Sequence, residues 1–125
     1  MQKVPFELFG EGQYLYFNVA RLAQLEQACG CGISNIVSKQ ELNLGVLIKI
    51  FMIGLGQHKK RNELWYAQRM QELLDDGASL EEEFYIPAVK AIAGSGILGK
   101  AAYYAAFPEE LTDKAAQDVE DEKKE

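Results

Sequence analysis

Residues that commonly bind metals or form disulfides are scarce in this chain. It has one histidine, His58, and two cysteines, Cys29 and Cys31. A lone histidine does not supply the closed set of ligands of a zinc site, so we expect His58 to be a solvent-exposed connector residue. The two cysteines could form half of a metal site or a redox pair, but the other half is missing, and we interpret them as small residues that are buried or half-buried. They are also too few for a secreted disulfide framework, which favours a cytoplasmic location.

An export signal and a long apolar run are also lacking. The first 12 residues have no continuous apolar core and no small-residue cleavage site, so we expect no export. The longest apolar stretch, residues 41–57, is shorter than the roughly 20 residues that cross a bilayer, so no membrane span is predicted. The net charge of -6 argues against a surface that neutralises phosphates, and nucleic acid is therefore not the expected partner.

No group of residues has the pattern of a catalytic site. Glu81–Glu83 open a predicted helix, where the helix dipole favours negative charge, so a structural role explains them. Gly54–Gly56 followed by Lys59 superficially resembles a phosphate loop, but it lies at the end of a predicted helix rather than at a start that follows a strand. The basic run Lys59–Arg61 is typical of a solvated turn. We therefore expect neither enzymatic activity nor a cofactor.

The dominant feature that is present is the stretch 41–57, ELNLGVLIKIFMIGLGQ. Apolar residues follow the three-and-four spacing of a helix and also cover much of its opposite side, and Lys49 is the one charge in the middle of the run. A helix that is apolar all round must be enclosed, so we predict a buried central helix.

Shorter elements are predicted around this helix. Two aromatic-rich runs within residues 1–17, separated by a Gly-Glu-Gly turn, indicate a β-hairpin. We therefore expect a mainly α fold, a small helical bundle around the central helix with an N-terminal hairpin, in one domain over residues 1–107. An acidic tail, residues 108–125, is predicted to be disordered or partly helical, since it has eight carboxylates against three lysines. Further helices are predicted at residues 19–29 after an Asn18 cap, 33–39, 63–76 after an Asn62 cap, from Ser79 onward and at 97–107.

The predicted helix that follows Ser79 has two local signals. Ser79 and Glu82 form a capping box, in which each side chain bonds the backbone amide of the other residue. Pro87 lies inside the helical pattern and lacks an amide proton, so we expect a kink or break near Tyr85.

Aromatic residues are the candidates for contact with a partner. Helical spacing favours the core for most of them, whereas the adjacent tyrosines beside the acidic tail are candidates for an exposed docking surface. The predicted partner-binding residues are Tyr14, Tyr16, Tyr85, Tyr103 and Tyr104.

The order of these features resembles the small tail assembly chaperones of long-tailed bacteriophages and related gene transfer agents. The resemblance covers roughly residues 5 to 95. In that family a β segment leads to a helix with a Leu-Glu pair that ends in glycine, then to a buried helix that ends in Gly-Leu, and then to an acidic turn. The matching positions in this chain are Leu25–Glu26, Gly30, Gly54–Leu55 and Asp75–Gly77.

The resemblance implies a noncatalytic protein of the host bacterial cytoplasm that binds the tape measure protein and assists the tail tube protein during assembly. A homo-oligomer is compatible with it. The alternative from the residues themselves is a small helical DNA-binding regulator, for which the short helices and the basic connector are the motivation. No helix-turn-helix pair with a basic recognition helix is visible, which favours the chaperone.

Overall fold

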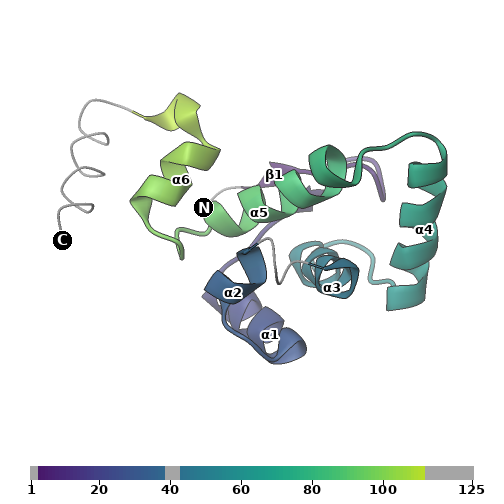
Figure 1. The fold of residues 1–125 in the computed structure, drawn as a ribbon, viewed down its shortest axis with the longest axis horizontal. Helices are drawn as coiled ribbons and strands as arrows, with labels where there is room; N and C mark the ends of the chain where they lie inside the picture. Colours follow the sequence, from purple (N-terminus) through teal and green to yellow (C-terminus); the bar gives the residue numbers. More distant parts are fainter. Residues whose placement is uncertain (1–2, 39–42, 112–125) are drawn as a thin grey trace.

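The computed structural model describes residues 3–38 and 43–111, and this part of the chain is mainly α-helical with a small antiparallel N-terminal hairpin (Figure 1). The predicted fold class is therefore confirmed. Most of the predicted acidic tail and the first residues of the predicted 41–57 helix lie outside the described residues.

The elements in chain order are β1 (Val4–Pro5), β2 (Tyr14–Leu15), α1 (Val19–Cys29), α2 (Ile33–Val37), α3 (Leu44–Gly54), α4 (Glu63–Asp75), the π-helix η1 (Leu80–Tyr85), α5 (Ile86–Ala93), α6 (Lys100–Ala106) and the 3-10 helix η2 (Pro108–Glu110).

Helix α3 is the centre of the fold, where it contacts α1, α4, α5 and β2. Leu47, Ile50 and Phe51 on one of its sides are completely buried. The prediction that this helix is enclosed on every side is wrong, since Leu44 is 52% exposed and Ile53 is half-buried. A chain of this size has too few elements to cover all sides of one helix, because small domains bury a smaller fraction of their surface.

Aromatic rings surround Phe51 and join the hairpin to the helices. The Phe51 ring stacks on Phe6 with centroids 4.8 Å apart and meets Phe9 edge-on at 5.3 Å. Phe84 of η1 meets the same ring edge-on at 6.0 Å. Such ring pairs add about 0.5–1.5 kcal/mol each beyond the area that they bury, so this cluster is a main contributor to the stability of the fold.

The hairpin is shorter than predicted. Val4 pairs with Leu15, and the Phe6 amide donates to the Gln13 carbonyl over 2.9 Å. The chain then turns over residues 8–12, so the ladder ends early. An isolated hairpin of this length is marginal in water, and burial of Leu15 against the helices stabilises it.

The predicted caps Asn18 and Asn62 are present, and Asn43 is a further cap that was not predicted. The side-chain oxygens of Asn18, Asn43 and Asn62 each accept the backbone amide of the residue three positions later, at the starts of α1, α3 and α4. Gly30 ends α1 in the left-handed conformation, with φ of 72°. Val19 in the first turn of α1 is 74% exposed, whereas Leu22 and Leu25 of the same helix are buried.

The predicted capping box takes a different form from the expected one. The Ser79 Oγ accepts the Glu82 amide over 3.2 Å, but the Ser79 amide donates to the Glu83 carboxylate over 2.8 Å rather than to Glu82. Residues 80–85 are a π-helix, in which the Ile86 amide bonds the Glu81 carbonyl five residues back. The π turn contains one more residue than an α-helical turn, so the side chain that reaches back to the Ser79 amide is that of Glu83. In an α-helix it would be that of Glu82.

Pro87 lies at the start of α5, directly after the π-helix. In a continuous α-helix its ring would crowd the carbonyl of residue 83, and the wider π turn relieves this contact. The predicted break near Tyr85 is absent, because the chain stays helical through this residue. What changes there is the hydrogen-bond pattern, from that of a π-helix to that of an α-helix.

Gly54 at the end of α3 lies against the hairpin. Its carbonyl accepts the Tyr16 amide over 2.9 Å. A Cβ atom added to Gly54 would lie 2.8 Å from a ring carbon of Phe17 and 2.9 Å from a methyl carbon of Leu15, both of which are buried. The absence of a side chain at this position allows β2 to pack directly on α3.

Replacing Gly54 with alanine is expected to lower the free energy of unfolding by about 1–3 kcal/mol, since it overpacks a tight contact and this outweighs the helix propensity of alanine. The matched control is Gly45→Ala in the same helix, where the added Cβ meets one side-chain atom at 3.5 Å. That variant should be stabilised by up to about 1 kcal/mol. Urea unfolding followed by circular dichroism measures both, and equal stabilisation of the two variants would contradict the described contact.

Helix α6 lies beyond the end of α5, away from α1, α3 and α4 (Figure 1). It contacts α5 and η2, and none of its residues is fully buried. The chain reaches it through a glycine-rich turn in which Gly96 and Gly99 have φ of 86° and 93°. A non-glycine side chain is strained in this conformation, so these glycines allow the chain to set α6 apart from α5.

Candidate functional site

A largely apolar groove lies between η1 and α5, α6 and the end of α2. Its volume is about 890 Å³, within the size range of ligand pockets. Aliphatic side chains and alanines form most of its surface. We call it the α5–α6 groove, and its lining residues are Val37, Leu80, Glu81, Tyr85, Ile86, Val89, Lys90, Ala93, Leu98, Ala102, Ala105 and Ala106.

The groove exists because the helix formed by η1 and α5 is apolar on two faces. Phe84, Ala88 and Ile92 face the core and are completely buried. Ile86 and Val89 lie on another face, line the groove and are not fully buried, and Ile86 is 54% exposed. The second apolar face is thus left uncovered by the described chain, which is typical of a surface that contacts another molecule.

Helix α6 forms the opposite wall with small side chains. The α6 residues that line the groove are Ala102, Ala105 and Ala106. Alanines leave room for another backbone to approach closely, whereas larger residues would close the gap with their own side chains. The groove is therefore wide enough along α6 to accept bulky side chains.

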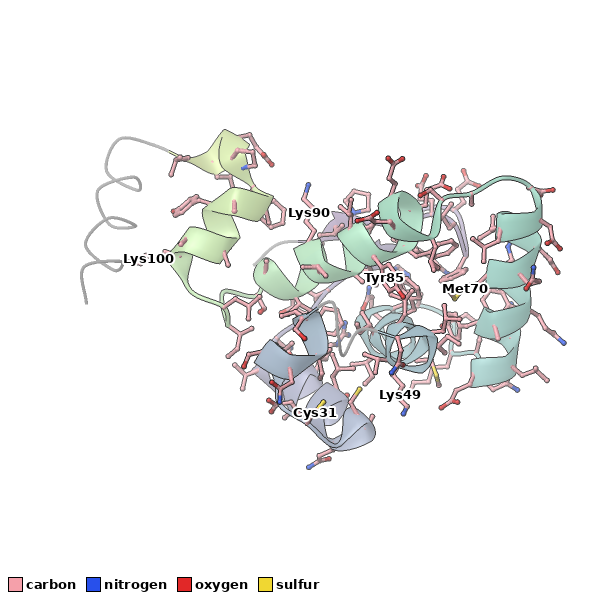
Figure 2. The ribbon with its side chains drawn as sticks, viewed as in Figure 1. Cys31, Lys49, Met70, Tyr85, Lys90 and Lys100 are labelled. Atoms are coloured by element: carbon pink, nitrogen blue, oxygen red, sulfur yellow. The ribbon has the colours of Figure 1, made fainter. Side chains whose placement is uncertain are left out.

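Two charged residues, Glu81 and Lys90, interrupt the apolar lining. Lys90 is half-buried, and its Nζ lies 4.9 Å from the ring centroid of Phe107, which is itself buried. Figure 2 shows Tyr85 and Lys90 extending from the same helical segment, with Lys100 at the beginning of α6.

Tyr85 is the one predicted partner-binding tyrosine that lines the groove. Tyr14 and Tyr16 lie on the hairpin, beside the end of α3. The Tyr14 ring meets His58 edge-on with centroids 4.8 Å apart, and the Tyr16 ring lies under the Arg21 guanidinium at 5.1 Å. Both hairpin tyrosines are half-buried by contacts within the chain.

Tyr103 and Tyr104 lie on α6 but do not belong to the lining of the groove. Their rings meet edge-on with centroids 5.1 Å apart, and the Tyr103 hydroxyl donates to the Glu110 carboxylate over 2.6 Å. The five predicted tyrosines are therefore distributed over three places and do not form one surface. Their role in partner binding stays a prediction.

His58 connects the hairpin to the end of α3. It is half-buried, and its Nε2 accepts the Tyr14 amide over 3.0 Å. The neighbouring Gln57 side chain donates to the Tyr14 carbonyl. The prediction of a solvent-exposed connector residue is therefore wrong, because the hairpin folds back over the connector and covers His58.

The cysteines are half-buried and free, as predicted. Burial raises the pKa of the Cys29 thiol, and the nearby positive charge of Lys49 opposes this shift in part. A raised pKa keeps the thiol protonated and weakly reactive at neutral pH. Within residues 3–38 and 43–111, no three or more histidine, cysteine or carboxylate side chains are placed to hold a metal ion.

A second, smaller hollow of about 500 Å³ lies between α1, the end of α3 and the basic connector. Arg21, Lys60 and Arg61 contribute its positive charge. The Arg21 guanidinium donates to the Tyr16 carbonyl over 2.9 Å, and the Arg61 guanidinium lies 4.8 Å from the Trp65 ring centroid. Residues 59–61 are exposed, as predicted, and two of the three cationic side chains of the hollow already have contacts within the chain.

Among the described helices, none combines the length and the apolar character that a membrane span requires. Comparisons of the chain with protein-family models, with curated proteins and with solved structures found no match.

The sequence contains a signal for the groove that the predictions did not use. Lys90 is the one charged residue of α5, IPAVKAIA, and nearly all of the remaining positions are apolar. The same all-round apolar pattern indicated the central helix at residues 41–57. Applied to residues 86–93, it would have identified a helix with one face for the core and another for a further contact.

Proposed function

We propose that this chain is a noncatalytic tail assembly chaperone of a phage or prophage, which binds the tape measure protein and assists tail tube assembly in the host bacterial cytoplasm. The α5–α6 groove carries the proposal. It is large and mainly apolar, and it lies between helices, which is the kind of surface that receives an amphipathic helix. The resemblance over residues 5 to 95 supplies the identity of the partner.

The groove fits the task that such a chaperone performs. A tape measure protein is a long helical chain with apolar stripes, which would associate with one another if left in water. Ile86 and Val89 on one wall and the alanines of α6 on the other can cover one stripe at a time. The net charge of -6 keeps the loaded complex soluble through repulsion between copies.

Size-exclusion chromatography with light scattering tests the proposal, with the chain alone and with the tape measure protein encoded beside it. We expect a complex that contains both proteins, and self-association of the chain alone is compatible with the role. A strict monomer that does not bind this partner would contradict the proposal.

A DNA-binding regulator has less support. Three cationic side chains, those of Arg21, Lys60 and Arg61, line one small hollow, and Arg21 and Arg61 are held there by contacts with the hairpin and with Trp65. A regulator needs a basic element that enters a groove of DNA. A salt-dependent shift of duplex DNA in a gel would favour this alternative over the chaperone.

A further inference from the structure

The charge on Lys90 distinguishes one place in the wall of the α5–α6 groove. Lys90 is half-buried, and its Nζ lies over the face of the Phe107 ring at 4.9 Å. Within residues 3–38 and 43–111, no carboxylate forms an ion pair with it. The other charged lining residue, Glu81, is already engaged in an interaction. Lys90 is therefore the charge in the groove that is available to an occupant.

An occupant that covers this ammonium group removes part of its remaining water. Desolvation of a charge is unfavourable unless a group of opposite charge compensates it, and the Phe107 ring compensates it in part. A fully apolar occupant would therefore leave the covered charge without a partner, whereas an occupant with a carboxylate at this point would neutralise it.

We propose that the groove selects a helix of the partner protein whose apolar stripe is flanked by a carboxylate that pairs with Lys90. This inference rests on the function proposed above and names the feature by which the chain chooses among helical segments. It commits to a helix of another protein as the occupant.

The dimensions of the groove determine where the carboxylate lies. The eight residues of α5 span about 12 Å at 1.5 Å per residue, which matches an occupant with apolar anchors at positions i, i+3 or i+4, and i+7. Ile86, Val89 and Ala93 line the groove along this length, and Lys90 lies within one turn of each of them. The carboxylate is therefore expected within one helical turn of an anchor and not on the opposite face of the occupant.

The test uses overlapping 20-residue peptides that cover the tape measure protein, with binding to the full chain measured by fluorescence anisotropy. In the tightest peptide, each carboxylate is replaced in turn by lysine. We expect one of these replacements to weaken binding to the wild-type chain roughly tenfold, as for a partly desolvated ion pair. The lysine-substituted peptide should recover most of the lost affinity when it binds the Lys90→Glu chain, because the positive charge is then on the peptide and the negative charge on the chain.

Lys90→Met and Lys59→Glu are the control variants. Lys90→Met keeps the aliphatic stem and removes the charge, so it should make the binding insensitive to that peptide carboxylate. Lys59→Glu makes the same change of charge at an exposed connector residue outside the groove and should behave as the wild type.

The outcomes separate the two levels of the proposal. Peptides that bind but show no coupling between any carboxylate and Lys90 overturn this inference and leave the chaperone role standing. Peptides that do not bind at all contradict both. If light scattering shows that the chain alone forms a dimer that Lys90→Glu disrupts, the occupant is a second copy, and the inference is wrong.

Discussion

Replacing Phe51 with alanine is expected to lower the free energy of unfolding by about 3–5 kcal/mol, the range for truncation of a buried aromatic residue. The side chain is completely buried and contacts the rings of Phe6, Phe9 and Phe84. Its removal leaves a cavity that borders the hairpin, α3 and η1 at once. Urea denaturation monitored by circular dichroism measures the change.

Leu44→Ala in the same helix is the control for this prediction. Leu44 is 52% exposed, so its truncation should change the free energy of unfolding by less than about 1 kcal/mol. If the two substitutions had similar effects, α3 would not have one buried side and one open side, and the described centre of the fold would be incorrect.

Replacing Ile86 with aspartate is expected to weaken binding of the tape measure protein by at least about 30-fold, which corresponds to the loss of a hot-spot residue of roughly 2 kcal/mol. The substitution places a carboxylate in the apolar wall of the α5–α6 groove. Since Ile86 is 54% exposed, the folded chain should tolerate the change. Isothermal titration calorimetry measures the affinity, and circular dichroism verifies the fold.

Ile97→Asp is the matched control, because Ile97 is 49% exposed and does not line the groove. Both substitutions introduce the same charge in place of the same residue. An equal loss of affinity in the two variants would indicate a nonspecific effect of charge, and no loss in either would place the binding surface elsewhere.

Local signals in the sequence were sufficient to place most of the helices. Asn18 and Asn62 were identified as caps because asparagine binds the amides at a helix start, and these bonds are present. Apolar spacing also predicted the inner face of α4, Tyr66, Met70, Leu73 and Leu74. The first two are buried and the two leucines are half-buried. These features depend on neighbours a few positions apart, so periodicity and propensity determine them.

The features that were not predicted depend on departures from the α-helical period of 3.6 residues or on contacts between distant parts of the chain. The π-helix η1 has a wider turn than an α-helix. The carboxylate that accepts the Ser79 amide is therefore that of Glu83 and not that of Glu82. His58 becomes half-buried through a bond to Tyr14, which is 44 positions away in the sequence. Contacts at this separation depend on the tertiary fold rather than on the local sequence.

The α5–α6 groove was missed for a related reason. Its walls come from three separate segments, and no one of them has the composition of a binding site by itself. The predicted partner-binding residues were all tyrosines, and of these Tyr85 lies in the groove. Ile86, Val89 and the alanines of α6 were not considered as contact residues, because apolar residues at helical spacing fit a core face as well as an open face.

Hydrogen-exchange mass spectrometry of the chain with and without the tape measure protein tests the central claim most directly. If the α5–α6 groove holds a helix of this partner, the amides of residues 80–93 and 98–106 should exchange more slowly in the complex, while those of α1 and α4 should be unchanged. Protection that is confined to α1, α4 or the hairpin, with none along α5 and α6, would contradict the account.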